Sequence, residues 1–573
     1  MIHKIFILLF LFSGLELYGQ ETSWLLTFGG AGDDEAYDCV ASPDGGLLVC
    51  GNVRDTADFG PVHLETSSLD MFVMKLSQKG EVLWVSTASS ISGSKTTAFG
   101  LAVDAENNVY VGGRYSDTTS FGALTVYPHE DELGDAFIAK LNSSGEYLWV
   151  KGFTGPAGDQ LEKLAVSGNN IVATLRPSNT ITIAGVEVKN DYPNASTTFN
   201  YAVVVSLSSE GEVNWITKVN GKASFARDIK AGKNGGIFVP FTASMVSATP
   251  FITIQGVAGL TPLGNPAGND DIYLTRLNET NGSVVWVNRI GSAGSEMSYT
   301  LSLDSDDNIY CGALVQGQTQ LNSIDGNLQK LELNGAKYDY LLCKYSPAGN
   351  LQWGNMQGGL ENEGAHDIAI APDGEIYTSA YFLDPETVFG PDKFSIDADG
   401  NAGLIIRHDM DGSYLWGRKA SAFYNDGTNR SHFYGWGMTM GSDHELLVCG
   451  SYEGALSFYT GENFDDPQEG KNIWIAMIYP GDIDTTTVIE PNSVKTADTG
   501  KPFFYPNPAS RSITLTEPDI RSVDIFDMSG RLVTRKFLSS PEIPILDVPE
   551  GFYLVKCKTL KGEVVTQKLI INR

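Results

Sequence analysis

Tryptophan recurs along most of this chain at a nearly constant spacing, and this repeat limits the folds that the chain can adopt. The copies lie 60 to 71 residues apart, at Trp24, Trp84, Trp149, Trp215, Trp286, Trp353 and Trp416. Between them, runs of alternating apolar and polar residues predict short β-strands. A period of this length built from strands is typical of a β-propeller, in which each repeat forms one blade.

Each repeat contains three strand patterns before its tryptophan. The first two flank a turn rich in Asp, Asn and Gly, as in GLAVDAENNVYVGG (100–113) and IAIAPDGEIYTSA (368–380), and this predicts a hairpin. The third strand follows, as in DAFIAKL (135–141). A turn containing glycine then leads into the tryptophan strand, as in KGEVLWV (79–85). The repeat therefore predicts a four-stranded blade.

The third-strand pattern occurs seven times, and the last copy, NIWIAMI (472–478), has no tryptophan strand after it. Conversely, Trp24 opens a tryptophan strand that no other strand of its repeat precedes. We therefore predict an all-β, seven-bladed propeller over residues 24–480, closed by the N-terminal strand: residues 24–28 complete the blade formed by residues 433–480. Such closure removes the unpaired edges that an open array would expose.

The repeat also resembles a known family. FGGAGDDEAYD (28–38), LLVCG (47–51), DMFVMKL (70–76) and GEVLW (80–84) are similar to the bacterial β-propeller repeat called SBBP. The resemblance covers roughly residues 24–480 and implies the propeller fold. It leaves the function open, because propellers carry many unrelated functions.

The first residues read as an export signal. Lys4 supplies a positive start, and residues 5–12 are an apolar run too short to span a membrane. We predict a signal peptide over residues 1–19, cleaved near Gly19, and a mature protein without a transmembrane span.

Composition changes near the C-terminus. Residues 481–502 are rich in Thr, Asp and Pro and read as a linker. The formal charge is -32 for residues 1–502 and +2 for residues 503–573. The final 71 residues show short alternating strands, which predict a small Ig-like β-sandwich.

The C-terminal segment also resembles a known family. FYPNPAS (504–510), VDIFDMSGRLV (523–533), LDVPEGFYLVKC (546–557) and KLIINR (568–573) are similar to the type A sorting domain of the type IX (Por) secretion system of Bacteroidetes. The resemblance implies a translocon and a sortase as partners, and a protein secreted or held on the outer cell surface after passage through the periplasm. The residues that would mark the sorting signal are Tyr505, Pro506, Asn507, Pro508, Gly530, Gly551, Lys568 and Arg573.

The net charge argues against one class of function, and the cysteines allow two outcomes. A net charge of -30 argues against nucleic-acid binding, which needs a basic face. Cys39 with Cys50 and Cys311 with Cys343 lie near each other in the predicted strands. Either pair forms a disulfide or remains as buried thiols; thiols are the more common outcome in a core.

Acidic loops give weak candidates for a Ca²⁺ site. The loop after a tryptophan strand, as in GGAGDDEAYD (29–38), gathers with its equivalents on one face of the propeller, and carboxylate oxygens are Ca²⁺ ligands. The candidates are Asp33, Asp34, Asp304, Asp306, Asp397 and Asp399. The competing interpretation is that Asp, Asn and Gly are the residues that turns require. No other cofactor is indicated.

No catalytic constellation emerges, so we expect no enzyme. The pairs His366-Asp367 and His408-Asp409 are expected at strand ends or turns, with a role in surface hydrogen bonding. We favour an exported binding propeller that recognises a glycan or a protein. The alternatives are a structural spacer in a surface layer and a polysaccharide-acting enzyme with its site at the mouth of the channel.

Overall fold

Strands form the regular structure of this protein, which we describe from a computed structural model. The described residues are 24–30, 32–91, 93–130, 133–190, 200–220, 223–244, 253–256, 259–262, 269–332, 337–357, 362–383, 386–395, 402–423, 433–441, 444–453, 455–457, 463–464, 471–478, 504–505, 509–515, 520–527, 532–537, 542–545, 548–549, 551–559 and 564–571. Within these ranges the chain contains no helix, and hence none that could cross a membrane. The chain divides into two compact units, which contain Leu25–Met477 and Ile478–Arg573.

The larger unit is an all-β, propeller-like arrangement of antiparallel blades. In one blade the sheet order is β6–β7–β10–β11, so its four strands are arranged across the sheet in chain order. The innermost strands are β2 (Glu35–Ala41), β6 (Thr96–Val103), β12 (Leu161–Ser167), β18 (Ala223–Ala226) with β19 (Lys230–Ala231), β25 (Met297–Leu303), β31 (Glu363–Ile370) and β37 (Phe433–Met440). The second strands are β3 (Leu47–Phe59), β7 (Val109–Tyr115), β13 (Asn170–Leu175), β20 (Gly236–Ser244), β26 (Ile309–Val315), β32 (Ile376–Phe382) and β38 (Leu446–Glu453).

The two outer strands of each blade are those with the clearest sequence pattern. The third strands are β4 (Val62–Leu76), β10 (Asp135–Leu141), β16 (Val203–Ser208), β23 (Asp270–Asn278), β29 (Asp339–Tyr345), β35 (Ala402–His408) and β41 (Lys471–Ile478). The tryptophan strands are β1 (Trp24–Gly30), β5 (Val82–Ser90), β11 (Tyr147–Phe153), β17 (Val213–Asn220), β24 (Val284–Gly291), β30 (Leu351–Gln357) and β36 (Tyr414–Phe423). The third strands are buried on both faces, because neighbouring blades cover them.

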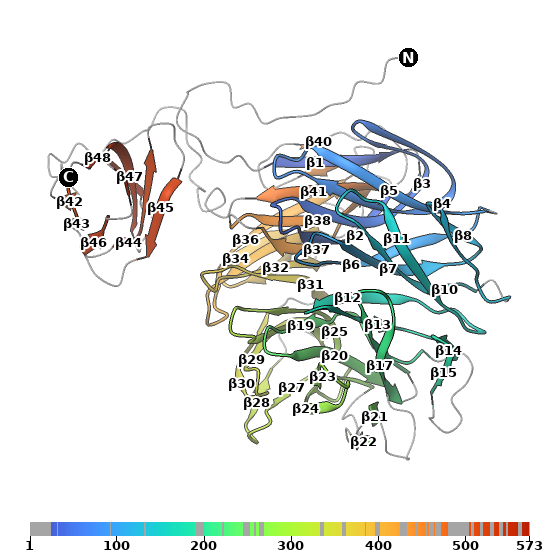
Figure 1. Ribbon diagram of the computed structural model, residues 1–573. Coiled ribbons are helices and arrows are strands. Elements are labelled where there is room, and N and C mark those ends of the chain that lie inside the picture. Colours follow the sequence, from blue (N-terminus) through green and yellow to red (C-terminus); the bar gives the residue numbers. More distant parts are fainter. Residues whose placement is uncertain are drawn as a thin grey trace. The chain divides into compact units, whose positions relative to one another are not determined.

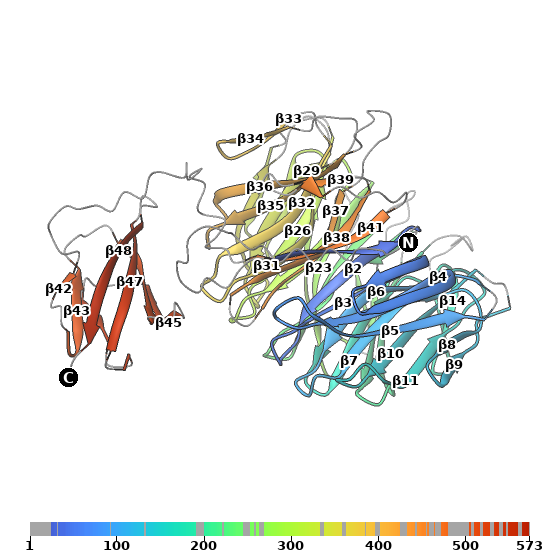
Figure 2. The same ribbon diagram turned by 90° about the horizontal axis from the view of Figure 1, so that it is seen from above.

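The innermost strands pack against one another around the axis of this unit. Contacts run from β37 to β2, β6, β12, β19, β25 and β31, and from β31 back to β37. In Figures 1 and 2 the orange strands β37, β38 and β41 accordingly lie beside the blue strands from the start of the chain.

The first strand, β1, joins the last described strands of the larger unit. The sheet order is β37–β38–β41–β1, so β1 occupies the position that a tryptophan strand holds in other blades. Its Gly29 and Gly30 also pair with Asp58 and Ala57 in the extended β3–β4 hairpin. The backbone N–H of Asp34 donates to the carbonyl oxygen of Lys471 at 2.8 Å. Residues more than 430 positions apart in sequence therefore share one sheet.

Short hairpins cover the outer edges of several blades. Each hairpin comes from the connection between the second and third strands of the following blade; Ser89 and Ser90 of β5, for example, pair with Ser120 and Thr119. This pairing protects backbone groups at an edge that would otherwise be free to pair with another chain. The outer hairpins are β8 (Thr119–Phe121) with β9 (Leu124–Val126), β14 (Thr180–Ile183) with β15 (Val186–Lys189), β21 (Thr253–Gly256) with β22 (Gly259–Pro262), β27 (Thr319–Asn322) with β28 (Leu328–Leu331), β33 (Glu386–Phe389) with β34 (Asp392–Ser395), and β39 (Ala455–Ser457) with β40 (Asn463–Phe464).

The repeating tryptophans fasten each blade to the next. The Nε1 of Trp84 donates to the carbonyl oxygen of Ser143 at 3.1 Å, and the Nε1 of Trp286 donates to that of Pro347 at 3.0 Å. The acceptors lie in the turn before the next tryptophan strand. The glycine of that turn has a positive φ and lies against the indole; a Cβ on Gly349 would be 2.9 Å from Trp286. The pattern of a glycine followed by a tryptophan strand thus encodes contact between blades.

The smaller unit contains two sheets around a shared core. One has the order β42–β43–β46 and the other β45–β44–β47–β48. Ile513, Val523 and Val555 from the two sheets belong to one buried apolar cluster. The strands are β42 (Phe504–Tyr505), β43 (Ser512–Leu515), β44 (Ile520–Asp527), β45 (Leu532–Phe537), β46 (Glu542–Pro544), β47 (Gly551–Thr559) and β48 (Val564–Ile571).

Five cysteines of the propeller are buried free thiols. They are Cys39, Cys50, Cys311, Cys343 and Cys449. Cys311 and Cys343 face each other in register between β26 and β29, yet they form no disulfide. Burial raises the pKa of the Cys50 thiol well above its usual value, which makes this group unreactive.

Candidate functional site at the inner rim

One residue bulges out of nearly every innermost strand at the same point. The register against the second strand shifts between Ala36 and Asp38, for example, and places Tyr37 in a β-bulge. We call the equivalent residues the rim. Its members are Tyr37, Phe99, Glu162, Arg227, Tyr299, His366 and Trp436. A bulge re-aims a side chain, which is why such bulges are common beside functional sites.

Rim residues from successive blades contact one another. The ring centroids of Tyr37 and Phe99 are 5.3 Å apart. The rings of Tyr299 and His366 are nearly parallel, with an angle of 6° and a centroid distance of 6.0 Å. His366 is also nearly parallel to Tyr434, at 6.3 Å and 9°. Because the tyrosines are partly exposed, their rings are available to a ligand.

The rim contains one acidic residue, Glu162, and one basic residue, Arg227, and the two have different kinds of partner. Glu162 accepts from the Nε of Arg176 at 2.8 Å and from Gln160 at 2.9 Å. The guanidinium of Arg227 instead lies 4.3 Å from the ring centroid of Tyr299 and 5.2 Å from that of Phe225. These are cation–π contacts, which hold the charge without using its N–H donors.

A cluster of buried charges follows the rim by one residue. Asp38, Asp228 and Asp367 each accept a backbone N–H from the next innermost strand: that of Leu101 at 2.8 Å, of Leu301 at 2.6 Å and of Met438 at 2.7 Å, respectively. These carboxylates therefore fasten blades together near the axis. Charge-assisted bonds of this kind are about twice as strong as neutral ones.

Two lysines compensate the three carboxylates. The Nζ of Lys163 is 2.6 Å from Asp38, and the Nζ of Lys230 is 2.8 Å from Asp228. Burial is the main cause that raises the pKa of Asp367 to about 6, against the opposing effect of both lysines. Burial lowers the pKa of Lys163, but the carboxylates of Asp38, Asp367 and Asp228 outweigh it and raise that pKa above its usual value.

The expectation that His366 and His408 lie at the surface was wrong. His366 is the bulge residue of β31 and is 9% exposed, while His408 ends β35 and is 1% exposed. Burial lowers the pKa of each imidazole to about 4. The sequence suggested a turn because each histidine precedes an aspartate, but the strand continues through the first pair.

The candidate Ca²⁺ ligand Asp34 is engaged in a turn. Its carboxylate is fully buried and accepts the N–H of Gly30 at 2.7 Å and of Arg54 at 2.8 Å. Burial raises its pKa to about 7. Asp33 lies beside it and accepts from the N–H of Lys471 at 3.4 Å.

Asp304 is likewise a turn residue. Its carboxylate accepts the N–H groups of Asp306 and Asn308 at 3.0 and 2.9 Å, and the hydroxyl of Tyr310 at 3.1 Å. Asp104 organises the equivalent turn in the same way. Asp397 and Asp399 lie outside the described residues. Within the described ranges, no group of three or more metal-ligating side chains is assembled.

The sorting-signal residues fall on and around the strands of the smaller unit. Tyr505 belongs to β42, Gly551 begins β47, and Lys568 lies in β48 opposite Leu554. The others, Pro506, Asn507, Pro508, Gly530 and Arg573, lie outside the described residues.

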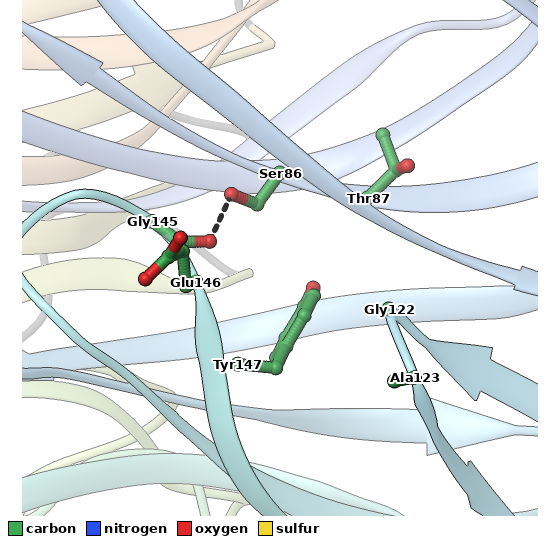
Figure 3. A pocket seen from close by; sticks show the side chains of 7 residues that line it. All are labelled: Ser86, Thr87, Gly122, Ala123, Gly145, Glu146 and Tyr147. Carbon is green, nitrogen blue, oxygen red and sulfur yellow. Dashed lines mark hydrogen bonds between the residues drawn. The ribbon is translucent and has the colours of Figure 1, made fainter.

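A surface groove of about 350 Å³ lies at the outer side of the propeller, between β5 and the turns beside β11. Figure 3 shows Tyr147 standing between Gly122 and the contact in which the Ser86 hydroxyl donates to the Gly145 carbonyl at 2.6 Å. The groove is lined mostly by small side chains and backbone. We therefore place the candidate site at the rim, where aromatic and charged groups converge.

A short sequence pattern marks four of the rim positions. Four rim residues follow an acidic residue by three positions, as Tyr37 follows Asp34 and Tyr299 follows Glu296. That acidic residue anchors the loop that enters the innermost strand; Glu296, for example, accepts the N–H of Ser292 at 2.9 Å. The other two pairs are Asp159 with Glu162 and Glu363 with His366.

These features define an exported β-propeller-like protein with a C-terminal sorting domain. Residues 503–572 match the family model described as "Secretion system C-terminal sorting domain". That domain directs the chain through the type IX secretion system to the cell surface or the extracellular space.

Comparison with known proteins finds distant relatives of the propeller. An uncharacterized WD repeat-containing protein of Acanthamoeba polyphaga mimivirus is 24% identical over 475 residues, which cover 71% of this chain and 33% of that protein. The chain thus spans about a third of that relative's length.

Similar solved structures include streptogramin B lyase, with a TM-score of 0.36 and 11% identity over 80% of this chain and 98% of that one. Another is PorZ, a surface component of the type IX secretion system of Porphyromonas gingivalis, with a TM-score of 0.13 and 9% identity over 96% and 100% of the two chains.

Proposed function

We propose that this protein is an exported binding module whose propeller recognises a glycan or a protein through the rim. The observation that carries the proposal is the contact between rim residues of successive blades, above all Tyr299 and His366 at 6.0 Å. Partly exposed aromatic rings on a rigid scaffold supply contact area at little cost in conformational entropy.

A catalytic role is not part of this proposal. The carboxylate of the rim itself, Glu162, is paired with Arg176. The carboxylates next to the rim, Asp38, Asp228 and Asp367, already accept backbone N–H groups and hold blades together. A glycosidase needs two carboxyl groups that are free to act on the sugar. A structural spacer would not need aromatic rings that remain exposed.

We further propose that the propeller has seven blades of the SBBP type and that β1, with Trp24, closes it. The sheet order β37–β38–β41–β1 supports this closure. The pairing of β1 with Ala57 and Asp58 supports it as well, because β5 pairs in the same way with Thr119 and Ser120. We place the signal peptide at residues 1–19, the propeller at 24–480, the linker at 481–502 and the sorting domain at 503–573.

For the sorting domain we propose an Ig-like sandwich that a translocon and a sortase of a Bacteroidetes cell recognise. The bond from the Tyr553 hydroxyl to the Pro549 carbonyl at 2.8 Å supports the fold, since Ig-like domains use a similar tyrosine contact. Ca²⁺ is not required in this proposal, because Asp34 and Asp304 serve the turns that contain them.

The binding proposal is tested with a glycan array and with pull-down from a host extract. The mature wild-type chain is compared with a double variant, Tyr37→Ala with Phe99→Ala. The control is Tyr127→Ala, which removes an aromatic ring that is 70% exposed on an outer hairpin. We expect ligands that the wild type and the control retain and the double variant loses. Equal binding by all three proteins would overturn the role of the rim.

A further inference from the structure

The rim contains one arginine, Arg227, whose guanidinium forms no hydrogen bond or ion pair among the described residues. Among the described residues, the contacts of Arg227 are with rings: Tyr299 at 4.3 Å and Phe225 at 5.2 Å. Arg176 and Arg407 pair with the carboxylates of Glu162 and Glu375, and Arg276 donates to the carbonyl oxygen of Pro347. Arg227 has neither a carboxylate nor a carbonyl partner of this kind among the described residues.

The carboxylate of Asp228, the residue next to Arg227, is not available to pair with the guanidinium. Asp228 follows Arg227 directly, but its Oδ1 accepts from Ile229 N at 2.7 Å and from the Nζ of Lys230 at 2.8 Å. Its Oδ2 accepts from Leu301 N at 2.6 Å and from the Thr300 hydroxyl at 3.4 Å. Because these four bonds occupy the carboxylate, the guanidinium remains available to a ligand.

We propose that the rim binds an anionic polysaccharide and that Arg227 holds its acidic group. This inference rests on the proposed binding function and adds the chemical class of the ligand. The planar guanidinium offers paired N–H donors that match a carboxylate or a sulfate, and it is already oriented by the two rings. Tyr299 and Tyr37 present partly exposed rings on which the C–H face of a sugar can pack.

A polysaccharide fits the rim better than an acidic protein segment does. The rim residues are aromatic, charged or histidine, and none of them is aliphatic. Flat rings combined with a fixed ionic donor suit a ligand that alternates C–H faces with acidic groups. The net negative charge of the protein does not prevent this, since charges beyond about 8 Å are screened at physiological ionic strength.

The test measures binding of the mature full-length chain to polygalacturonate and to its methyl ester, which has the same backbone without the charge. Dextran sulfate and dextran form a second pair that distinguishes a carboxylate ligand from a sulfate ligand. We expect the acidic member of at least one pair to bind about tenfold or more tightly than its neutral counterpart. Arg227→Met should remove this preference, and Arg227→Lys should restore only part of it, because lysine keeps the charge without the fork.

Two controls separate the ligand class from the general binding function. Lys79→Met removes one exposed positive charge in the turn before β5 and should leave the preference unchanged. Thermal unfolding should differ little between Arg227→Met and wild type, since Arg227 forms no ion pair among the described residues and methionine keeps contact with the rings of Tyr299 and Phe225. If wild type and Arg227→Met bind the same neutral glycan or protein equally, the anionic-ligand inference fails and the binding function stands. If neither binds any glycan or protein, the proposed function fails as well.

Discussion

The Nζ of Lys163 lies 2.6 Å from the Oδ1 of Asp38, and this ion pair joins β2 and β12, the innermost strands on either side of β6. The other carboxylate oxygen, Oδ2, accepts the N–H of Leu101 from that intervening strand. Asp38 therefore connects three blades near the axis of the propeller.

Lys163→Met is expected to destabilise the protein by about 2–4 kcal/mol, because it leaves the carboxylate of Asp38 buried without its cation. Urea unfolding followed by tryptophan fluorescence measures the change. Lys151→Met is the matched control: its partner Glu212 is at 3.3 Å and 77% exposed, so its loss should cost less than about 1 kcal/mol. An equal loss of unfolding free energy in the two variants would show that the central ion pair stabilises the protein no more than an exposed pair does.

Gly349→Ala tests the contact between blades at the tryptophan turns. Gly349 has a φ of +87°, and its new Cβ would be 2.9 Å from Trp286. Gly326 also has a φ of +87°, but a Cβ there would meet nothing within 4 Å. Gly326→Ala should cost about 1–2 kcal/mol from backbone strain alone. Gly349→Ala should cost about 1–3 kcal/mol more, from the clash with the indole. Equal unfolding free energies for the two variants would contradict the role assigned to the tryptophan.

Removal of residues 21–30 tests closure by β1. The deletion exposes the edge of β41 and removes the packing of Leu25 and Phe28, which are 8% and 9% exposed. We expect a loss of about 3–6 kcal/mol from these two side chains, together with concentration-dependent association through the free edge. Unfolding curves and light scattering measure both effects, and an unchanged, monomeric protein would refute closure.

His408→Phe tests the pH dependence of stability. The folded pKa of His408 is about 4, below the unfolded value of about 6.5, so the folded state disfavours its protonation. Wild type should therefore lose up to about 3 kcal/mol from this group as the pH falls from 6.5 to 4. The variant lacks this loss, so its unfolding free energy relative to wild type should rise over that range. His63 is exposed, and its pKa is raised by Asp58, so His63→Gln should not reproduce the rise. A difference between His408→Phe and wild type that is independent of pH would disprove the assignment.

Deletion of residues 503–573 tests the sorting domain. The truncated chain should remain inside the cell, because the segment that the type IX system reads is missing. Fractionation and protease treatment of intact cells locate the protein. Arg227→Met in the full chain should be exported normally, which controls for defects of the propeller. Export of the truncated chain would show that another segment directs it.

Much of the fold could be predicted because the repeat encodes it locally. Alternation predicts the strands, and the glycine before each tryptophan strand predicts the turn, since a residue such as Gly349 needs a positive φ. The tryptophan strand that begins at Trp24, which lacks the rest of its repeat, and the incomplete last repeat indicated where β1 would lie. The sorting domain was recognisable because its pattern is contiguous in sequence.

The rim and the central charges could not be predicted in this way. Arg227, Tyr299 and His366 are separated by long intervals in sequence, and only the packing of neighbouring innermost strands brings them into contact. The bulges at these positions arise from pairing register, which a single strand does not encode. His366 and His408 show the same limit, because burial depends on which blades cover a strand.

The amino-acid sequence by itself thus determined the strand repeat, the turns and the export domain, which all depend on neighbours along the chain. Tertiary structure alone decided which side chains meet near the axis. There, Asp38 finds the N–H of Leu101 and the ammonium of Lys163, while Arg227 finds only aromatic rings among the described residues. The physical reason is that hydrogen bonds and ion pairs act over a few ångströms in space, regardless of the distance along the chain.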